Sequence, residues 1–205
     1  MPANLILDDL LQEAEFAHGH LCAGQILGVR MAMLACHRLG IDEPRGKDRK
    51  RLVTFVEIDR CATDAIGVVT GCRPGKRALK FRDWGKMAAT FVDLNLSLGD
   101  DLFRGLRISA LESSKHKASD LYPHLEKNPQ QMLAYREMPD DLLFSEQWVA
   151  VPLPRSEFPG FKGTRTTCSL CGEGINYDRF VERETGPVCL GCADPDHRYY
   201  QPLRA

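Results

Sequence analysis

Four cysteines near the end of this 205-residue chain constrain its fold more than any other feature. They form two Cys-x-x-Cys pairs separated by 17 residues, namely Cys168 and Cys171, then Cys189 and Cys192. Each pair places two thiolates on one tight turn, and a tetrahedral zinc ion at ~2.3 Å from sulfur needs two such turns facing each other. The spacing therefore predicts a zinc site with these four ligands. Two disulfides, a redox dithiol and an iron–sulfur cluster are the alternatives.

The segment around these cysteines has few large apolar residues, so we expect metal binding to supply most of its folding free energy. Apolar and polar side chains alternate in residues 175–177 and 179–181, as they do in the strands of a hairpin. A short helix is expected after Cys192. This order predicts a treble-clef or ribbon finger over residues 164–205. A segment rich in proline and glycine, residues 153–163, is expected to link it to a core domain over residues 1–152.

Composition indicates an ordinary globular protein, with 43% hydrophobic and 27% charged residues. A formal net charge of −1 gives no electrostatic reason for general nucleic-acid binding. No apolar run approaches the ~18 residues that span a bilayer, and the N-terminus has no signal-peptide pattern. We therefore expect a soluble cytoplasmic protein with reduced thiols and no membrane partner.

In the first 152 residues, apolar side chains recur every three to four positions in some segments, as in helices, and every second position in others, as in strands. This mixture predicts an α+β core. Helices are expected at Leu7–Ala17, Gln25–Arg38, Cys61–Thr70 and Glu126–Glu137. Strands are expected at Leu52–Ile58, Ala78–Arg82, Thr90–Leu94, Leu106–Leu111 and Trp148–Val151. The fold class is thus an α+β core domain followed by a small treble-clef-like zinc finger.

Metal-capable side chains also gather near the N-terminus, where His18, His20 and Cys22 lie within five residues at the break between two helices. Cys61 lies at a strand-to-helix junction, and the free N–H groups at a helix start are expected to stabilise a thiolate. Imidazole and thiolate both suit zinc and similar metals. We predict that His20, Cys22 and Cys61 converge on a second metal of unknown identity, with His18 as a further ligand. The alternative is that the histidines cap the break and the cysteines pack as small residues.

The same residues can serve catalysis. Cys22 or Cys61 would be the reactive thiolate, His18 or His20 the base, and Asp64 a carboxylate three residues after Cys61. The alternative is that Cys61 is a buried small residue and Asp64 a helix cap. The other two core cysteines are assigned differently: Cys36 faces the core, and Cys72 lies ~15 Å from Cys61 along the intervening helix.

A run of cations follows that helix, with six Lys and Arg among the fourteen residues from Arg73 to Lys86. The segment Thr70–Lys76 is similar to an anion-binding loop, although it lacks the Walker spacing. Arg73 and Lys76 are therefore predicted to hold an acidic cofactor or substrate. The alternative is a solvated edge strand, protected by its charge from pairing with other chains.

Three motifs, taken in order, resemble the FmdE family of formylmethanofuran dehydrogenase components over roughly residues 10–150. They are His18-Gly-His-Leu-Cys-Ala-Gly24, Asp59-Arg-Cys-Ala-Thr-Asp-Ala-Ile66 and Thr70-Gly-Cys-Arg-Pro-Gly-Lys76. The resemblance implies an α+β core, an appended treble-clef finger and an intertwined homodimer. It also implies a link to the molybdenum or tungsten enzyme that reduces CO₂ onto methanofuran in methanogenesis. The sequence has no pterin-binding domain or run of cluster-binding cysteines, so this chain is not expected to perform the redox chemistry alone.

Two functional hypotheses follow. In the first, the chain is an accessory or regulatory metalloprotein whose finger contacts protein or nucleic acid. In the second, it is an enzyme, or one component of an enzyme, that uses the core cysteines and histidines on a small acidic substrate.

Overall fold

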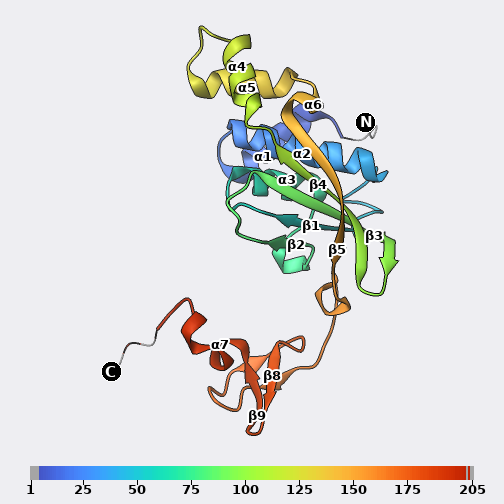
Figure 1. The fold of residues 1–205 in the computed structure, drawn as a ribbon, viewed down its shortest axis with the longest axis vertical. Coiled ribbons are helices and arrows are strands. Elements are labelled where there is room, and N and C mark those ends of the chain that lie inside the picture. Colours follow the sequence, from blue (N-terminus) through green and yellow to red (C-terminus); the bar gives the residue numbers. More distant parts are fainter. Residues whose placement is uncertain (1–4, 202, 204–205) are drawn as a thin grey trace. The chain divides into compact units, whose positions relative to one another are not determined.

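The computed structural model describes residues 5–201 and 203 of the chain. It divides into two compact units, the first ending at Pro154 and the second beginning at Arg155 (Figure 1). The first has the predicted α+β architecture, and the second carries the four-cysteine group, so the fold class is confirmed. The outer ends of the predicted domains, residues 1–4, 202 and 204–205, lie outside the described part. None of the described helices has the length and apolar character to cross a membrane.

The first unit combines six α-helices and a five-stranded sheet among its described residues. The helices are α1 (Leu7–His18), α2 (Ala23–Leu39), α3 (Cys61–Thr70), α4 (Ser113–Leu121), α5 (Lys127–Glu137) and α6 (Asp140–Leu143), with a 3₁₀ turn η1 at Pro74–Lys76. The strands are β1 (Leu52–Val56), β2 (Leu79–Phe81), β3 (Ala88–Gly99), β4 (Leu102–Ala110) and β5 (Phe144–Pro152).

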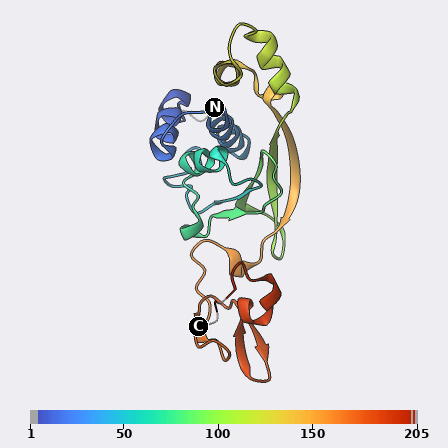
Figure 2. The same cartoon turned by 90° about the vertical axis from the view of Figure 1, so that its left-hand side faces the viewer.

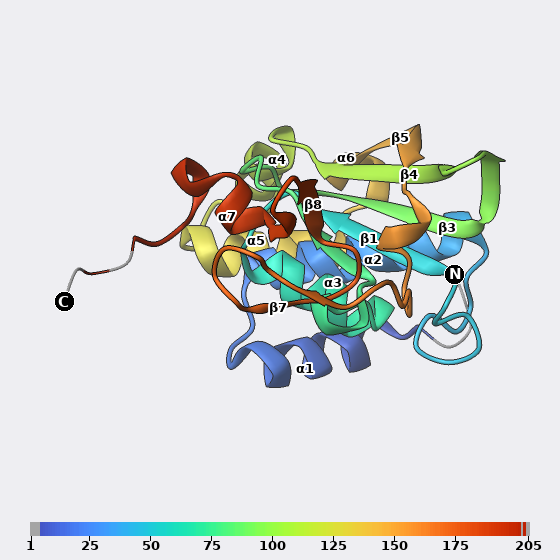
Figure 3. The ribbon, with the colours of Figure 1, turned by 90° about the horizontal axis from the view of Figure 1, so that it is seen from below.

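The sheet runs in the order β2-β1-β3-β4-β5, with β2 parallel to β1 and the other neighbours antiparallel. Helices α1, α2 and α3 cover one face (Figure 2). Helix α2 lies next to the sheet and α1 is the outermost layer (Figure 3). Because α2 is covered on both sides, its sequence is apolar all round and most of its side chains are buried.

A close helix crossing positions the start of α3. A Cβ atom added at Gly28 of α2 would lie 2.5 Å from the carbonyl oxygen of Ala62 and 2.9 Å from the Cβ of Ala65. No side chain larger than hydrogen fits at this point without movement of α3. Gly28 therefore sets how closely the two helices approach.

The sequence located the early elements well and the later ones less so. Helix α3 is found as predicted, but β3 extends to Gly99 and β5 begins at Phe144. The outer half of β3 is exposed, so pairing with β4, and not burial, extends the strand beyond its apolar residues. Helix α4 was missed because its sequence is polar and only Ser114 and Ala118 are buried.

The second unit contains η2 (Arg155–Glu157), β6 (Thr166–Thr167), β7 (Gly174–Ile175), β8 (Phe180–Arg183), β9 (Gly186–Cys189), α7 (Leu190–Ala193) and η3 (Pro195–His197). The predicted hairpin of residues 175–177 with 179–181 is wrong, because β7 pairs with β6 and β8 pairs with β9. Tyr177 and Asp178 both have positive φ, so the chain turns between these two hairpins. The short helix begins before Cys192 and not after it.

Candidate functional site

The four cysteines of the second unit converge on one point. Their sulfur atoms all lie within 4.8 Å of one another, and Cys171 Sγ is 4.0 Å from Cys189 Sγ. Four ligands at ~2.3 Å around a tetrahedral centre are separated by about 3.8 Å, so the group fits a metal ion. All four cysteines are free thiols, and a disulfide would require ~2.05 Å between sulfurs. The structure thus brings together the four predicted ligands.

Two knuckles and the start of α7 build this group. Cys168 is buried beneath the backbone and accepts a hydrogen bond from the N–H of Cys189 at 3.3 Å. This bond, together with one from the Cys171 N–H, lowers the pKa of Cys168 to about 6. The neighbouring Cys189 sulfur and burial raise the pKa of Cys192 to about 12. Four thiolates therefore cannot share this point without a cation, which is what a metal ion supplies.

One residue of this group was not predicted from the sequence. Arg198 donates from Nη2 to Cys192 Sγ at 3.1 Å, so a cation lies beside this end of the cluster. Arg198 follows the last cysteine by six residues, and no spacing pattern identifies it. The contact depends on the turn formed by η3.

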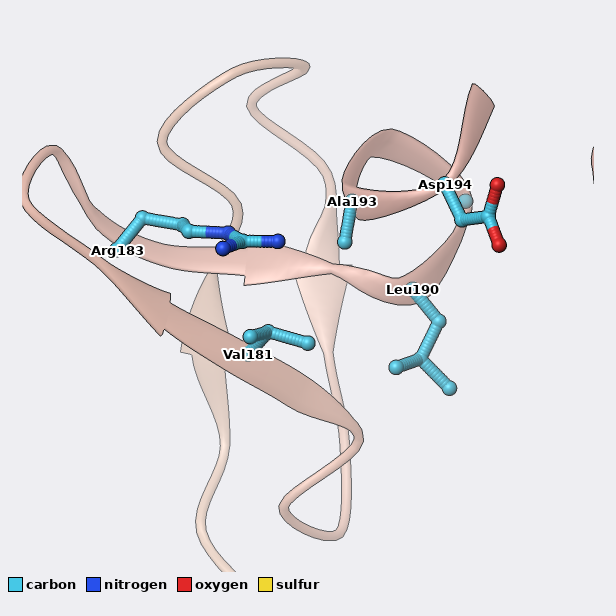
Figure 4. Close-up of a pocket in the computed structure, with 6 residues that line it drawn as sticks. Val181, Arg183, Leu190, Ala193 and Asp194 are labelled. Atoms are coloured by element: carbon cyan, nitrogen blue, oxygen red, sulfur yellow. The ribbon is translucent and has the colours of Figure 1, made fainter. Parts of the chain in front are cut away.

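A shallow groove of about 560 Å³ lies beside this cluster (Figure 4). Its lining residues come from β8, from α7 and from the residue after α7, and they are Val181, Arg183, Leu190, Gly191, Ala193 and Asp194. The guanidinium of Arg183 reaches along the groove past Val181, while the carboxylate of Asp194 points away from it. Leu190 is 55% exposed. The groove therefore offers an apolar floor with one cation.

The core candidates form a second cluster, at the amino end of α3. His18 ends α1, where Gly19 at φ 94° turns the chain. The His18 Nδ1 atom is 2.8 Å from Asp64 Oδ2, and the His18 ring centroid is 4.9 Å from that of His20. An ionised carboxylate only accepts hydrogen bonds, so Asp64 holds the proton on Nδ1 and leaves Nε2 available. Asp64 therefore orients His18.

Cys22 and Cys61 lie together in this cluster. Cys22 is close enough to Cys61 to raise the pKa of Cys61, and a Cβ atom built at Gly24 would be 3.4 Å from Cys61 Cβ and 3.8 Å from Cys22 Sγ. Both thiols are half-buried. Burial and then the Cys22 contact raise the pKa of Cys61, with Asp64 adding to the effect. Burial and Cys22 thus oppose the thiolate expected at this helix start, which stays a prediction.

The core cluster is more open than the finger cluster. Among the residues that the structure describes, only the finger cysteines form a group of three or more such ligand atoms within 4.8 Å of one another. His18, His20, Cys22 and Cys61 are neighbours around the same helix start, but their donor atoms are not gathered that closely. The second metal site remains a prediction.

The two cations predicted to hold a cofactor lie elsewhere. Arg73 precedes η1 and Lys76 ends it; this turn follows the carboxyl end of α3, whereas Cys61 begins that helix. Ten residues of helix separate the two positions by ~15 Å. Cys72, beside Arg73, is buried and donates its thiol proton to the Leu52 carbonyl. Cys36 is buried in the core as predicted, and burial raises its pKa to about 12.

Comparison with known proteins agrees with this architecture. One curated relative, from Archaeoglobus fulgidus, is described as a probable S-adenosyl-L-methionine-binding protein. It is 31% identical over 210 aligned positions, which cover 91% of this chain and 53% of the relative. This chain thus spans about half the length of that relative. A crystal structure of a protein from Syntrophus aciditrophicus, described as similar to FmdE of tungsten formylmethanofuran dehydrogenase, has a TM-score of 0.61. The two chains are 19% identical over 97% of each, which shows a shared fold.

The match to a protein family covers the part of the chain that holds the core cluster. The model of the family described as FmdE, molybdenum formylmethanofuran dehydrogenase operon, matches residues 17–145. This range begins just before His18 and includes Cys22, Cys61 and Asp64. The match covers more than half of the residues of this chain, and the chain therefore belongs to the FmdE family.

Proposed function

We propose that this chain is an accessory metalloprotein with two metal sites, a structural zinc in the finger and a second, open site in the core. The observation that supports it is that His18, Cys22 and Cys61, from the ends of three different helices, lie around the start of α3. Four protein ligands that fill the coordination sphere are typical of a structural zinc ion. Three protein ligands leave one coordination position for water or a small molecule.

The core residues suit such a site. Asp64 holds the His18 ring through Nδ1 and leaves Nε2 free to bind, an arrangement common around metal-bound histidines. The Cys22 and Cys61 thiols release their protons when they bind a metal, which overcomes the raised pKa of Cys61. A metal there would polarise a carbonyl or carboxylate of a small acidic ligand. His20, exposed beside His18, completes the ligand set or stands at its rim.

We infer that the finger is a treble clef that contacts another protein. Residues 155–205 contain seven Lys and Arg and seven Asp and Glu, and four zinc-bound thiolates add a net charge of −2. Nucleic-acid binding requires a clear excess of positive charge, which this segment lacks. The apolar groove between β8 and α7 instead suits a side chain of a protein partner. Family membership connects such a role to the one-carbon enzymes of methanogenesis, in the cytoplasm.

Metal stoichiometry tests the proposal. Full-length protein loaded with Co²⁺ should bind about two ions per chain, both with the intense near-ultraviolet absorption of thiolate ligands. Cys61→Ser should lose one ion and leave the finger spectrum intact. Cys72→Ser, at the other end of α3, is the matched control and should retain both. Wild-type protein that binds a single ion, lost on substitution of Cys171, would refute the core site.

The enzyme hypothesis needs a separate test. The accessible Cys22 and Cys61 thiols beside His18 favour it enough to warrant an assay of the metal-loaded protein with formyl and other one-carbon substrates. Turnover that disappears in Cys61→Ser but persists in Cys72→Ser would establish an enzyme. If the protein turns over none of these substrates and still retains a partner in pull-down, the enzyme hypothesis fails.

A further inference from the structure

The loop of residues 82–87 closes over the carboxyl end of β1. Its backbone is held at both sides, because Arg82 N–H donates to the Val56 carbonyl at 2.9 Å and Trp84 N–H donates to the Glu57 carbonyl at 3.2 Å. Lys86 N–H donates to the same Glu57 carbonyl at 3.1 Å. These bonds fix the positions of residues 84 and 86 before any ligand arrives.

Trp84 projects from this fixed loop and remains 62% exposed. Indole is the largest apolar side chain, and the core of this unit does not use most of its surface. The Lys86 ammonium lies 5.8 Å from the indole centroid, within the range of a cation–π contact. A rigid loop therefore presents an aromatic surface and a cation side by side.

The position of the pair is as informative as its composition. Strands β1 and β2 are parallel, with Val56 opposite Phe81, so the loop after β2 and the start of α3 lie at the same edge of the sheet. Cys61 follows Glu57 by four residues, a span of at most ~14 Å. The loop and the start of α3 thus both lie at the carboxyl end of β1, whereas Arg73 and Lys76 lie at the far end of α3.

Charge points the same way. Residues 80–86, which run from β2 through this loop, contain three Lys and Arg against a single Asp, a net charge of +2 in a chain whose total is −1. Part of this charge is already engaged, since Arg82 lies over the Phe55 ring at 5.4 Å. The segment as a whole still makes a local positive field that attracts anions to this edge.

We propose that Trp84 and Lys86 bind a planar heteroaromatic ring that carries phosphate or carboxylate groups, with the indole stacked on the ring and Lys86 paired with the anion. The inference rests on the proposed core function in one respect: it names the class of ligand for the edge where that site lies. A small ligand fits better than a nucleic-acid strand, because strands need a succession of stacking platforms along a basic groove and this loop offers one exposed indole.

Fluorescence tests the inference directly, since the chain has only two tryptophans. Trp148→Phe preserves an aromatic ring beneath Arg104 and leaves Trp84 as the sole indole emitter. The probe is ATP, with adenosine as the ring without anion and inorganic triphosphate as the anion without ring. S-adenosylmethionine, which joins adenosine to a cationic sulfonium, is the fourth probe. We expect ATP to quench Trp84 emission and to bind more tightly than the other three.

Variants assign the two contacts. Trp84→Ala in the otherwise native chain should weaken ATP binding about tenfold by calorimetry, and Trp84→Phe should restore most of it. Lys86→Gln should weaken ATP binding and leave adenosine binding unchanged. Lys127→Gln, an exposed lysine on α5, is the matched control and should bind as the native chain does. Trp84 is mostly exposed, so these variants should melt as the native chain does.

Three results would overturn the inference: no quenching by millimolar ATP, tighter binding of S-adenosylmethionine than of ATP, or tenfold tighter binding of decathymidylate. The last would make the loop a nucleic-acid contact. Cys61→Ser separates this inference from the core metal site. It should abolish metal binding in the core while ATP still quenches Trp84, so each can fail without the other.

Discussion

The close crossing of α2 and α3 makes Gly28→Ala the sharpest test of how this fold builds its core cluster. The new methyl group would lie 2.5 Å from the Ala62 carbonyl oxygen and 2.8 Å from the Ala62 Cα. Both are backbone atoms of α3 and cannot rotate away. Helix α3 must therefore move outward by about 0.5–1 Å, since contacts below 3.0 Å are not tolerated. Cys61 is adjacent to Ala62 and must move with it.

The size of the effect follows from two opposing contributions. Overpacking costs ~1–3 kcal/mol, and backbone atoms place this case near the upper end. Replacing glycine by alanine inside a helix returns about 1 kcal/mol. We therefore expect a net loss of about 2 kcal/mol in the free energy of unfolding. At 2–4 °C per kcal/mol for a domain of this size, the melting temperature should fall by roughly 4–8 °C.

Gly24→Ala is the matched control, with the same substitution one turn earlier in the same helix. Its methyl group would meet Cys61 Cβ at 3.4 Å and Cys22 Sγ at 3.8 Å, which are ordinary contact distances. With no overpacking to offset the gain from alanine, we expect its stability to match the native value or exceed it by up to ~1 kcal/mol. Urea unfolding followed by circular dichroism measures both variants, and Co²⁺ titration shows whether Gly28→Ala also weakens the core site. Equal stability of the two variants would refute the reasoning.

Four further predictions concern the metal sites, an ion pair and assembly. Cys171→Ser or Cys189→Ser should lower the zinc content measured by elemental analysis by about one ion per chain. Either substitution should unfold residues 164–205 and leave the amide signals of the core unchanged in NMR spectra. Asp64→Asn should lower metal affinity in the core about 10–100-fold, because an amide no longer fixes the His18 ring as an anionic acceptor; unchanged Co²⁺ affinity contradicts this role. The Arg38 side chain, through its hydrogen bond, lowers the pKa of Glu146. This ion pair therefore stabilises the fold at pH values above the ordinary glutamate pKa of ~4.3. The stabilisation is lost as the pH falls through the lowered pKa of Glu146. Glu146→Gln should therefore cost about 0.5 kcal/mol at pH 7 and nothing at pH 2 by urea unfolding, and an equal cost at both pH values would disprove the assignment. From the family resemblance we expect a homodimer, and sedimentation should give twice the chain mass of 23.0 kDa; a monomer at micromolar concentration excludes it.

Local patterns predicted the early helices because their signals lie within a few residues. Gly19, Gly40 and Gly71 follow α1, α2 and α3, and each adopts the left-handed conformation that ends a helix. The same locality made the finger predictable. Two Cys-x-x-Cys pairs specify their own turns, so the ligand set required no knowledge of the remaining chain.

Pairing between distant segments was not predictable in this way. The exposed end of β3 has no apolar alternation, and its strand form comes from the ladder with β4. The finger hairpins were assigned to the wrong partners because alternation marks a strand without naming its neighbour. Arg198 beside Cys192 likewise depends on a turn that no short motif specifies.

The core cluster shows where the two kinds of information divide. The sequence by itself identified His18, Cys22, Cys61 and Asp64 as residues with metal or acid–base chemistry, and it located each at a helix end. Only the tertiary structure decided that Asp64 holds His18, because 46 residues separate them along the chain. The parallel pairing of β1 with β2 then placed Trp84 and the start of α3 at the same end of β1 and left Arg73 and Lys76 at the far end of α3. Sequence spacing is one-dimensional, whereas the direction of each strand and the distance between helices arise only when the core packs.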